Sequence, residues 1–376
     1  MENLDGKMLY QETLERINTA ASFLGIDFIL RDIGNPVSIR GYIMLSPIVL
    51  SLLCTAYTII HFRDNLQDVA FGSVTLGVIL IVLTKITVLF KLKKCAHAII
   101  AEIKSILNRV KSDPVKSRKM FVGIKAFRIT YNTFCIGYFG TVAIMLCLSI
   151  GVCIYEREKL LFLGFILPYF DHEQSPGYEI NFLCHTIECV IGVGILAIFD
   201  GFVFGHMFIA CMHYNILIDC CTDFNTLLTE DDELTDEKSA ENCIMRLLTE
   251  HQSHIRMMRH LSDFATTHHL CLVLGDMIII ILTIFVLVEN VWIPGVFLLL
   301  TTVVNLFLLS CVGTIYIIYA EMFQEAIYNC KWYCFPPKIQ KALTFVLYMS
   351  QNPIQPSIGG FTGISMATFM KVSQCD

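Results

Sequence analysis

The segment ALTFVLYMSQNPIQPSIGGFTGISMATFM, residues 342–370, contains two apolar stretches separated by a pair of prolines. Pro353 and Pro356 each lack the backbone N–H that a continuous helix needs, so the chain must break between the two stretches. The second stretch carries no charge from Ile358 to Met370, yet it is shorter than the ~20 residues that cross a ~30 Å hydrocarbon core. The segment therefore predicts a last membrane helix in two halves, the second of them short.

The whole sequence has the composition of an integral membrane protein. Hydrophobic residues make up 55% and charged residues 16% of the 376 positions, and the mean hydropathy is +0.63. Soluble domains carry roughly 25% charged residues. Because lipid offers no partner to an open backbone, we expect helices as spanning elements. Six apolar segments precede the split one: 41–60, 69–90, 129–155, 181 to beyond 212, 269–288 and 296–320. The predicted fold is an all-α membrane protein with seven transmembrane helices.

The distribution of Lys and Arg sets the orientation of these helices. Twenty-two of these residues fall in the N-terminal segment and in the connections on its side of the membrane. The opposite connections hold three, Arg63, Arg157 and Lys159. We therefore expect a cytoplasmic N-terminus and an outer C-terminus. G-protein-coupled receptors have the reverse orientation, and NPIQP at 352–356 is not their Asn-Pro-x-x-Tyr motif, so the sequence excludes that class.

Four charged residues lie inside the apolar segments, where charges are costly and often functional. Lys85 is near the cytoplasmic end of the second helix, and we expect its amine to extend to the interface. We interpret Asp276 as a polar residue near the cytoplasmic start of the fifth helix, and Asp200 as a hydrogen-bonding partner between helices. Glu188 lies about two turns inside the outer end of the fourth helix. It contacts either a ligand or a structural partner such as His185.

The cysteines and histidines give no strong signal of a disulfide framework or a metal site. Most of the sixteen cysteines lie in apolar segments, where Cys behaves as a small hydrophobic residue. Cys153 and Cys184 are the pair expected at the outer surface, as a bridge or as two free thiols. His251 and His254 share a helix face, but two histidines without a third ligand are weak evidence for metal. The sequence likewise indicates no catalysis, cofactor or nucleic-acid binding.

The C-terminal third resembles the insect odorant receptor family in the stretch YIIYAEMFQEAIYNCKWYCFPPKIQKALTFVLYMSQNPIQPSIGGFTGISMATF, residues 316–369. The loop LPYFDHEQSPGYEI at 167–180 is similar to the Leu-Pro-x-aromatic loop before the family's fourth helix. The seven-helix layout, the inner N-terminus and the chain length agree with the same family. The matching positions in the C-terminal third are Tyr319, Glu321, Glu325, Ala326, Tyr328, Trp332, Pro336, Ser350, Gln351, Pro353, Gly360, Phe361, Ser365, Thr368 and Phe369.

The resemblance implies a ligand-gated, non-selective cation channel in the plasma membrane of olfactory neuron dendrites. Family members assemble as tetramers that usually pair an odour-tuned subunit with an olfactory co-receptor. The connection at 212–267 is too short for the co-receptor, so this chain resembles a tuning subunit. The implied parts are a cytoplasmic segment at 1–36, transmembrane helices 1–6 at 37–320, a cytoplasmic anchor at 321–350 and a pore-lining half-helix at 351–376.

Residue roles follow from the same resemblance. Thr368 and Val372 are the implied pore-lining residues. The implied subunit-anchor residues are Tyr319, Tyr328, Trp332 and Gln351. Tyr316 and Tyr333 suit the same anchor, with aromatic bodies packed and polar tips in water. A pocket for a small volatile ligand should be mostly apolar and lie in the outer half of the bundle. We expect the pocket residues of each helix to lie on one face of that helix, at spacings of three, four or seven. The predicted residues are Phe71, Thr75, Thr141, Met145, Leu148, Glu188, Ile191, Ile195, Ile281 and Phe285.

Three alternatives are weighed against this interpretation. A gustatory-type receptor channel shares the topology, but its ending is not matched by SMATFMKV at 365–372. A transporter would show broken helices in matching positions of two repeats, and here the break occurs at the end only. In the odorant receptor family the closing helix continues about a dozen residues further, and the dewetting constriction lies in that extension. We therefore also expect either a pore completed by partner subunits or a non-conducting, truncated partner subunit.

Overall fold

The computed structural model describes residues 6–26, 39–155, 159, 161–230, 233–289 and 292–373. The side chains of 39, 40, 289, 369 and 371–373 are outside this description. The elements, in chain order, are α1 (Gly6–Phe23), α2 (Ile39–His61), α3 (Leu66–Lys91), α4 (Lys93–Val110), α5 (Pro114–Tyr155), α6 (Gly177–Asn225), α7 (Glu237–Glu289), α8 (Ile293–Asn329), the 3₁₀ turn η1 (Trp332–Cys334), α9 (Pro337–Ser350), β1 (Ser357–Ile358), β2 (Thr362–Gly363) and α10 (Met366–Ser373).

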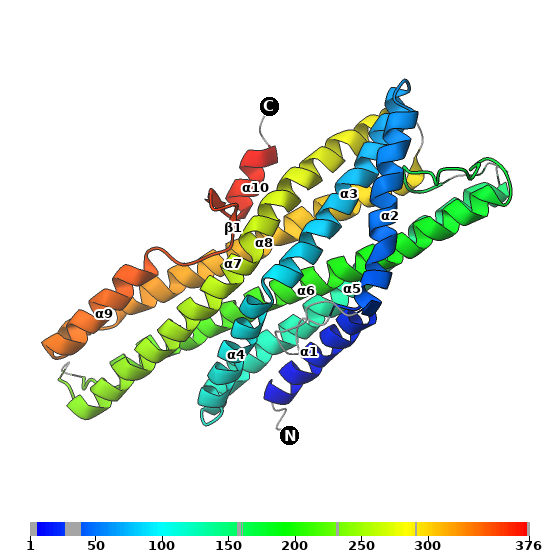
Figure 1. Ribbon diagram of the computed structural model, residues 1–376. Helices are drawn as coiled ribbons and strands as arrows, with labels where there is room; N and C mark the ends of the chain where they lie inside the picture. The colour runs from blue at the N-terminus through cyan, green and yellow to red at the C-terminus, as the bar shows by residue number, and fades with distance from the viewer. Residues whose placement is uncertain are drawn as a thin grey trace.

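The predicted all-helical architecture is confirmed (Figure 1). Within the described ranges, the six helices α2, α3, α5, α6, α7 and α8 are long and apolar enough to cross a membrane. The predicted split of the last helix is also confirmed, because α9 and α10 are separated by the segment 351–365. That segment holds a small antiparallel hairpin in which Ile358 pairs with Thr362. Gly359 and Gly360 form its turn at φ values of 61° and 83°, which glycine adopts without strain.

Three helices are longer than their apolar segments predicted. α5 begins at Pro114 rather than at 129, α7 begins at Glu237 rather than at 269, and α8 continues to Asn329 rather than ending at 320. In the α5 extension Met120, Ile124 and Phe127 are buried while Lys125 between them is exposed. A search for uncharged segments does not detect such a pattern, although the helical spacing of the buried residues is regular.

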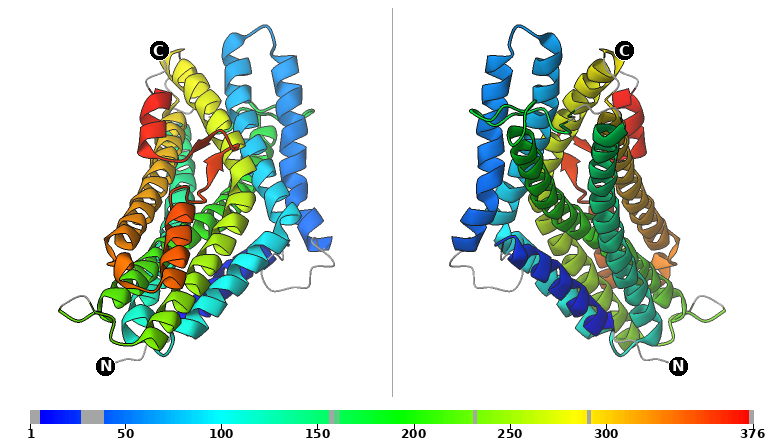
Figure 2. Two further views of the ribbon diagram at one scale, coloured as in Figure 1. Left: turned by 90° about the vertical axis from the view of Figure 1, so that its left-hand side faces the viewer. Right: turned by 90° about the vertical axis from the view of Figure 1, so that its right-hand side faces the viewer.

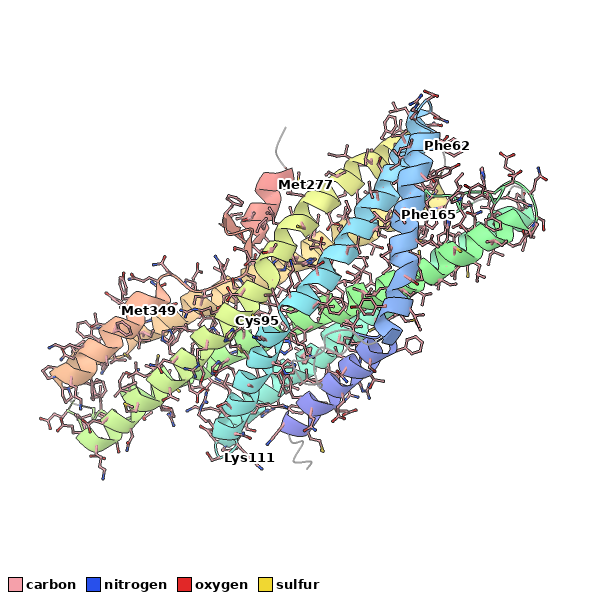
Figure 3. The ribbon with its side chains drawn as sticks, viewed as in Figure 1. Phe62, Cys95, Lys111, Phe165, Met277 and Met349 are labelled. Atoms are coloured by element: carbon pink, nitrogen blue, oxygen red, sulfur yellow. The ribbon has the colours of Figure 1, made fainter. Side chains whose placement is uncertain are left out.

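The helices run between two ends of the molecule (Figure 2). One end holds the N-terminus, the α4–α5 turn with Lys111 and the α6–α7 connection (Figures 1 and 3). We call it the inner end, because the charge distribution predicts that it faces the cytoplasm. The α2–α3 turn and the α5–α6 connection lie at the other end, which we call the outer end. The short helices α1 and α4 pack at the inner end, α1 against α5 and α4 against α7.

The core of the bundle is α6, which packs against α1, α2, α3, α5, α7 and α8. Every residue from 197 to 207 in α6 is buried, including Asp200. Close approach to α5 depends on two glycines of that run. A Cβ at Gly201 would lie 2.7 Å from the Tyr131 ring, and one at Gly205 would overlap the Phe127 ring.

Replacing Gly205 by alanine should destabilise the protein by about 1–3 kcal/mol through overpacking. The Phe127 ring cannot move aside freely, because it is fully buried between the rings of Tyr10 and His206. Gly137 in α5 is the matched control, since a Cβ there meets nothing within 4 Å. Thermal unfolding in detergent should show a lower midpoint for Gly205→Ala and little change for Gly137→Ala. Equal midpoints for the two variants would contradict the tight α5–α6 contact.

Candidate functional site

A cavity of about 140 Å³ lies among α3, α5, α6, α7 and α8, toward the outer end of the bundle. Its walls are mostly apolar. The lining residues are Val74, Thr75, Val78, Ile81, Lys85, Tyr138, Thr141, Val142, Met145, Phe162, Leu163, Cys189, Val193, Leu196, Leu272, Asp276, Ile279, Trp292, Leu298, Thr301, Thr302 and Asn305. A mostly apolar cavity with a few polar side chains is the usual form of a small-molecule site.

The α5–α6 connection covers part of this cavity. Its residues Phe162 and Leu163 contribute to the lining. The connection is held by side chains of the bundle: the backbone N–H of Gly164 donates to Thr75 Oγ1 at 2.7 Å, and that of Ile166 donates to Thr58 Oγ1 at 3.0 Å. Phe165, labelled in Figure 3, packs with Cys54 of α2. The covering segment is therefore an ordered part of the site.

Two polar lining residues of the cavity, Lys85 and Tyr138, both bind the buried carboxylate of Asp200. Lys85 Nζ lies 2.6 Å from both carboxylate oxygens of Asp200, and Tyr138 donates to Asp200 Oδ2 at 2.6 Å. The side chains of Lys85 and Asp200 are 0% and 2% exposed. The predicted hydrogen bond of Asp200 between helices is confirmed. The expectation that Lys85 extends to the interface is wrong, because Asp200 provides a buried counter-charge.

Other polar groups line the same cavity. Thr141 and Thr301 form a hydroxyl–hydroxyl hydrogen bond of 3.2 Å between α5 and α8. Asp276 is buried in the interior of α7. Its predicted position near the start of a helix is wrong, because α7 begins much earlier, at Glu237. Trp292, at the start of α8, packs edge-on against Phe71 with ring centroids 4.7 Å apart.

Glu188 borders a neighbouring, smaller cavity of about 70 Å³ between α2, α3 and α6. The two cavities share Thr75, Val78 and Val193 among their lining residues. In the described structure Glu188 forms no hydrogen bond with His185, whose Nε2 instead lies 3.0 Å from the carbonyl oxygen of Phe165. His185, which the sequence suggested as a structural partner of Glu188, therefore binds the α5–α6 connection instead.

The structure places the predicted ligand-binding residues in three groups. Thr75, Thr141 and Met145 line the cavity of about 140 Å³, which we call the main cavity because it lies in the outer half of the bundle. Phe71 packs against Trp292, which lines the same cavity. Ile191 and Ile195 are buried in the core, and Leu148 and Phe285 are half-buried outside the cavity lining. Ile281 lines a different cavity between α7, α8 and the C-terminal segment. On α6 the lining face is instead Cys189, Val193 and Leu196, and on α7 it is Leu272, Asp276 and Ile279.

The segment between α9 and α10 is attached to α7 and α8, the two helices that line one side of the cavity. Ser262 Oγ donates to the Gln355 carbonyl at 3.3 Å, and the Gly359 N–H donates to the Thr266 carbonyl at 3.3 Å. On α8, Thr314 Oγ1 accepts from the Met366 N–H at 2.7 Å. A second cavity of about 320 Å³ lies here and is lined partly by Met277, labelled in Figure 3, and Thr368. The side chain of Val372 is outside the described residues.

The residues predicted for a subunit anchor differ in exposure. Tyr328 is 68% and Trp332 38% exposed, Gln351 is exposed and Tyr319 is half-buried. Tyr316 is fully buried, so the expectation that its polar tip reaches water is wrong. Its hydroxyl donates to the carbonyl oxygen of Ile354 at 2.8 Å, inside the break of the last helix.

Tyr316 belongs to a chain of polar side chains that crosses the inner half of the bundle. The Tyr316 hydroxyl lies 3.2 Å from His254 Nε2, and His254 Nδ1 lies 3.3 Å from His213 Nδ1. His213 Nε2 is 3.1 Å from Glu250 Oε2, and Arg109 donates to both Glu250 oxygens at 2.7 and 2.8 Å. The chain connects α4, α6, α7 and α8 with the segment before α10.

The cysteine pair singled out in the sequence is not bridged. Cys153 and Cys184 are both free thiols. The sulfur of Cys153 lies 3.0 Å from the hydroxyl of Tyr178. This is the second of the two alternatives that the sequence left open.

This architecture is similar to that of known proteins. A family model described as 7tm Odorant receptor matches residues 65–375. The solved structure of olfactory receptor OR5 from the insect Machilis hrabei in complex with eugenol is similar, with a TM-score of 0.80 and 12% sequence identity over 98% of this chain and 96% of that one. The structure of the same receptor described without eugenol gives a TM-score of 0.79 with the same identity and coverage. At this identity the likeness to OR5 establishes the fold, including the seven-helix layout.

Proposed function

Because the chain belongs to the 7tm odorant receptor family, we propose that it is the odour-tuned subunit of a ligand-gated, non-selective cation channel. Its partner in the channel is an olfactory co-receptor subunit, and the complex lies in the plasma membrane of sensory neuron dendrites. The ligand is a small volatile molecule held in the cavity of about 140 Å³. The proposal is supported by that cavity and by OR5 of Machilis hrabei, a receptor of the same fold whose structure is known in complex with eugenol.

Two helices connect the ligand cavity to the proposed pore. α7 and α8 line the cavity through Asp276 and Asn305, and both helices also bind the segment that leads into α10. A ligand that shifts these helices therefore also shifts α10. Under this proposal Thr368 faces the pore, and Tyr319, Tyr328, Trp332 and Gln351 contact neighbouring subunits.

Filling the cavity should weaken the response to odorants. We expect Val193→Phe, on the α6 wall of the cavity, to raise the odorant concentration for half-maximal current roughly tenfold or more, because about 1.4 kcal/mol of lost binding changes an affinity tenfold. The measurement is whole-cell current in cells that also express an olfactory co-receptor, with surface labelling of both chains.

Val190→Phe is the matched control, one turn away on the same helix. Val190 is 42% exposed and lies outside the lining of the cavity. We expect Val190→Phe to leave the concentration dependence of the current close to that of the unmodified chain. Unchanged responses of Val193→Phe to every active volatile would place the odorant elsewhere.

A further inference from the structure

Three side chains that line the main cavity each present a polar atom without a hydrogen-bond partner among the described residues. These atoms are Trp292 Nε1, Asn305 Oδ1 and Asp276 Oδ2. Trp292 and Asp276 are 6% and 5% exposed. Buried polar atoms are nearly always hydrogen-bonded, because leaving them unpaired carries the full cost of removing them from water. Three lining residues of the cavity therefore have unused hydrogen-bonding capacity.

Two of these groups lie at a similar depth. At 1.5 Å of rise per residue, Asp276 is about 20 Å along α7 from its outer end, and Asn305 is about 18 Å along α8 from its outer end. α7 and α8 pack against each other. Asp276 and Asn305 therefore line the inner part of the cavity from two neighbouring helices, whereas Trp292 lines its outer end. A bound molecule with one polar group can direct it to this region and leave its apolar body among the aliphatic walls.

The charges around this region favour a neutral ligand. Lys85 lines the same cavity, but it is already bound to both oxygens of Asp200, which also accepts from Tyr138. A ligand ammonium group would meet the Lys85 ammonium, and a ligand carboxylate would meet the carboxyl group of Asp276. A hydroxyl group carries no charge, donates one hydrogen bond and accepts others. It can therefore pair with Asp276 in either protonation state of that carboxyl group.

The size of the cavity limits the apolar part of the ligand. A cavity of about 150 Å³ in another protein holds one benzene molecule, and the volume here is about 140 Å³. We propose that Asp276, assisted by Asn305, binds the hydroxyl group of a neutral alcohol or phenol with a body of about one six-membered ring, and that this contact determines the ligand class. The inference rests on the proposed function only in taking the cavity as the ligand site.

The sequence contains two tryptophans, and this allows a binding measurement that does not depend on channel opening. Trp292 lines the cavity, and Trp332 lies in η1 beyond the inner end of α8. In the full chain carrying Trp332→Phe, Trp292 fluorescence reports on the cavity alone. Purified protein is titrated with cyclohexanol and with methylcyclohexane, in which a methyl group replaces the hydroxyl group. Each affinity is corrected for partition into the detergent. The hydrogen bond to the buried carboxyl group should raise the affinity for cyclohexanol, relative to that for methylcyclohexane, roughly tenfold or more.

Replacing Asp276 by leucine should remove this preference, and Asp276→Asn should keep part of it, because the amide still accepts a hydrogen bond. Thr283→Val is the control: Thr283 is also buried on α7, with an unpaired hydroxyl in the described structure, but it does not line the cavity. An equal preference in all variants, or no response of Trp292 to cyclohexanol, would overturn the inference. A chain with the Asp276-dependent preference but no odour-evoked current would instead contradict the proposed channel function.

Discussion

Replacing Lys85 by methionine should destabilise the protein by about 3–5 kcal/mol, because it leaves Asp200 as a buried charge without its counter-ion. Lys85 is fully buried and lies 2.6 Å from both Asp200 oxygens, so water cannot replace the lost partner without entering the bundle. The measurement is thermal unfolding in detergent, together with the fraction of the chain that reaches the cell surface.

A second substitution distinguishes loss of the charge pair from loss of packing. The double variant Lys85→Met, Asp200→Leu removes both charges and should recover most of the lost stability, as replacing whole buried ion pairs by apolar residues often does. Lys338→Met is the control, because Lys338 and its partner Glu241 are 85% and 48% exposed. Exposed pairs contribute at most about 1 kcal/mol. A Lys85→Met protein as stable as this control would show that the pair is not buried as described.

Replacing Glu250 by alanine should cost about 2–3 kcal/mol of stability. Glu250 is buried on α7 and accepts hydrogen bonds from both Arg109 of α4 and His213 of α6. Its removal leaves a fully buried histidine and a partly buried arginine without their partner. The expected loss is smaller than at Lys85, because the Arg109 side chain is 29% exposed and water can reach it.

Glu102→Ala is the matched control for Glu250. It removes a carboxylate that binds Arg256 across α4 and α7, with that arginine 50% exposed. We expect a loss of about 1 kcal/mol or less for this pair. Hydrogen exchange at 351–365 should also rise in Glu250→Ala, because His213, His254 and Tyr316 connect Glu250 to Ile354. Unchanged exchange in that segment would show that the polar chain does not support the break in the last helix.

The helices and the break were predictable from the sequence because each depends on local composition. Uncharged segments identify spanning helices, and Pro353 and Pro356 interrupt the last one wherever the rest of the chain lies. The inner parts of α5 and α7 were not predicted, since both contain charged residues and a search for uncharged segments passes over them.

The cavity was only partly predictable. Thr75, Thr141 and Met145 line it, but the lining faces of α6 and α7 could not be identified. Both helices are apolar around most of their circumference in the membrane, so periodicity does not mark one face. Lys85 could not be matched to Asp200, because the pair joins residues that are 115 positions apart. Phe162 and Leu163 carried a usable signal, an apolar run at 160–167 inside an otherwise polar connection.

The most direct test of the central claim is whole-cell current evoked by a panel of volatiles, in cells that express this chain with and without an insect olfactory co-receptor. We expect a cation current that requires both this chain and the co-receptor, and that is strongest for ring-sized alcohols and phenols. No evoked current with any volatile, although both chains reach the surface and purify together, would contradict it.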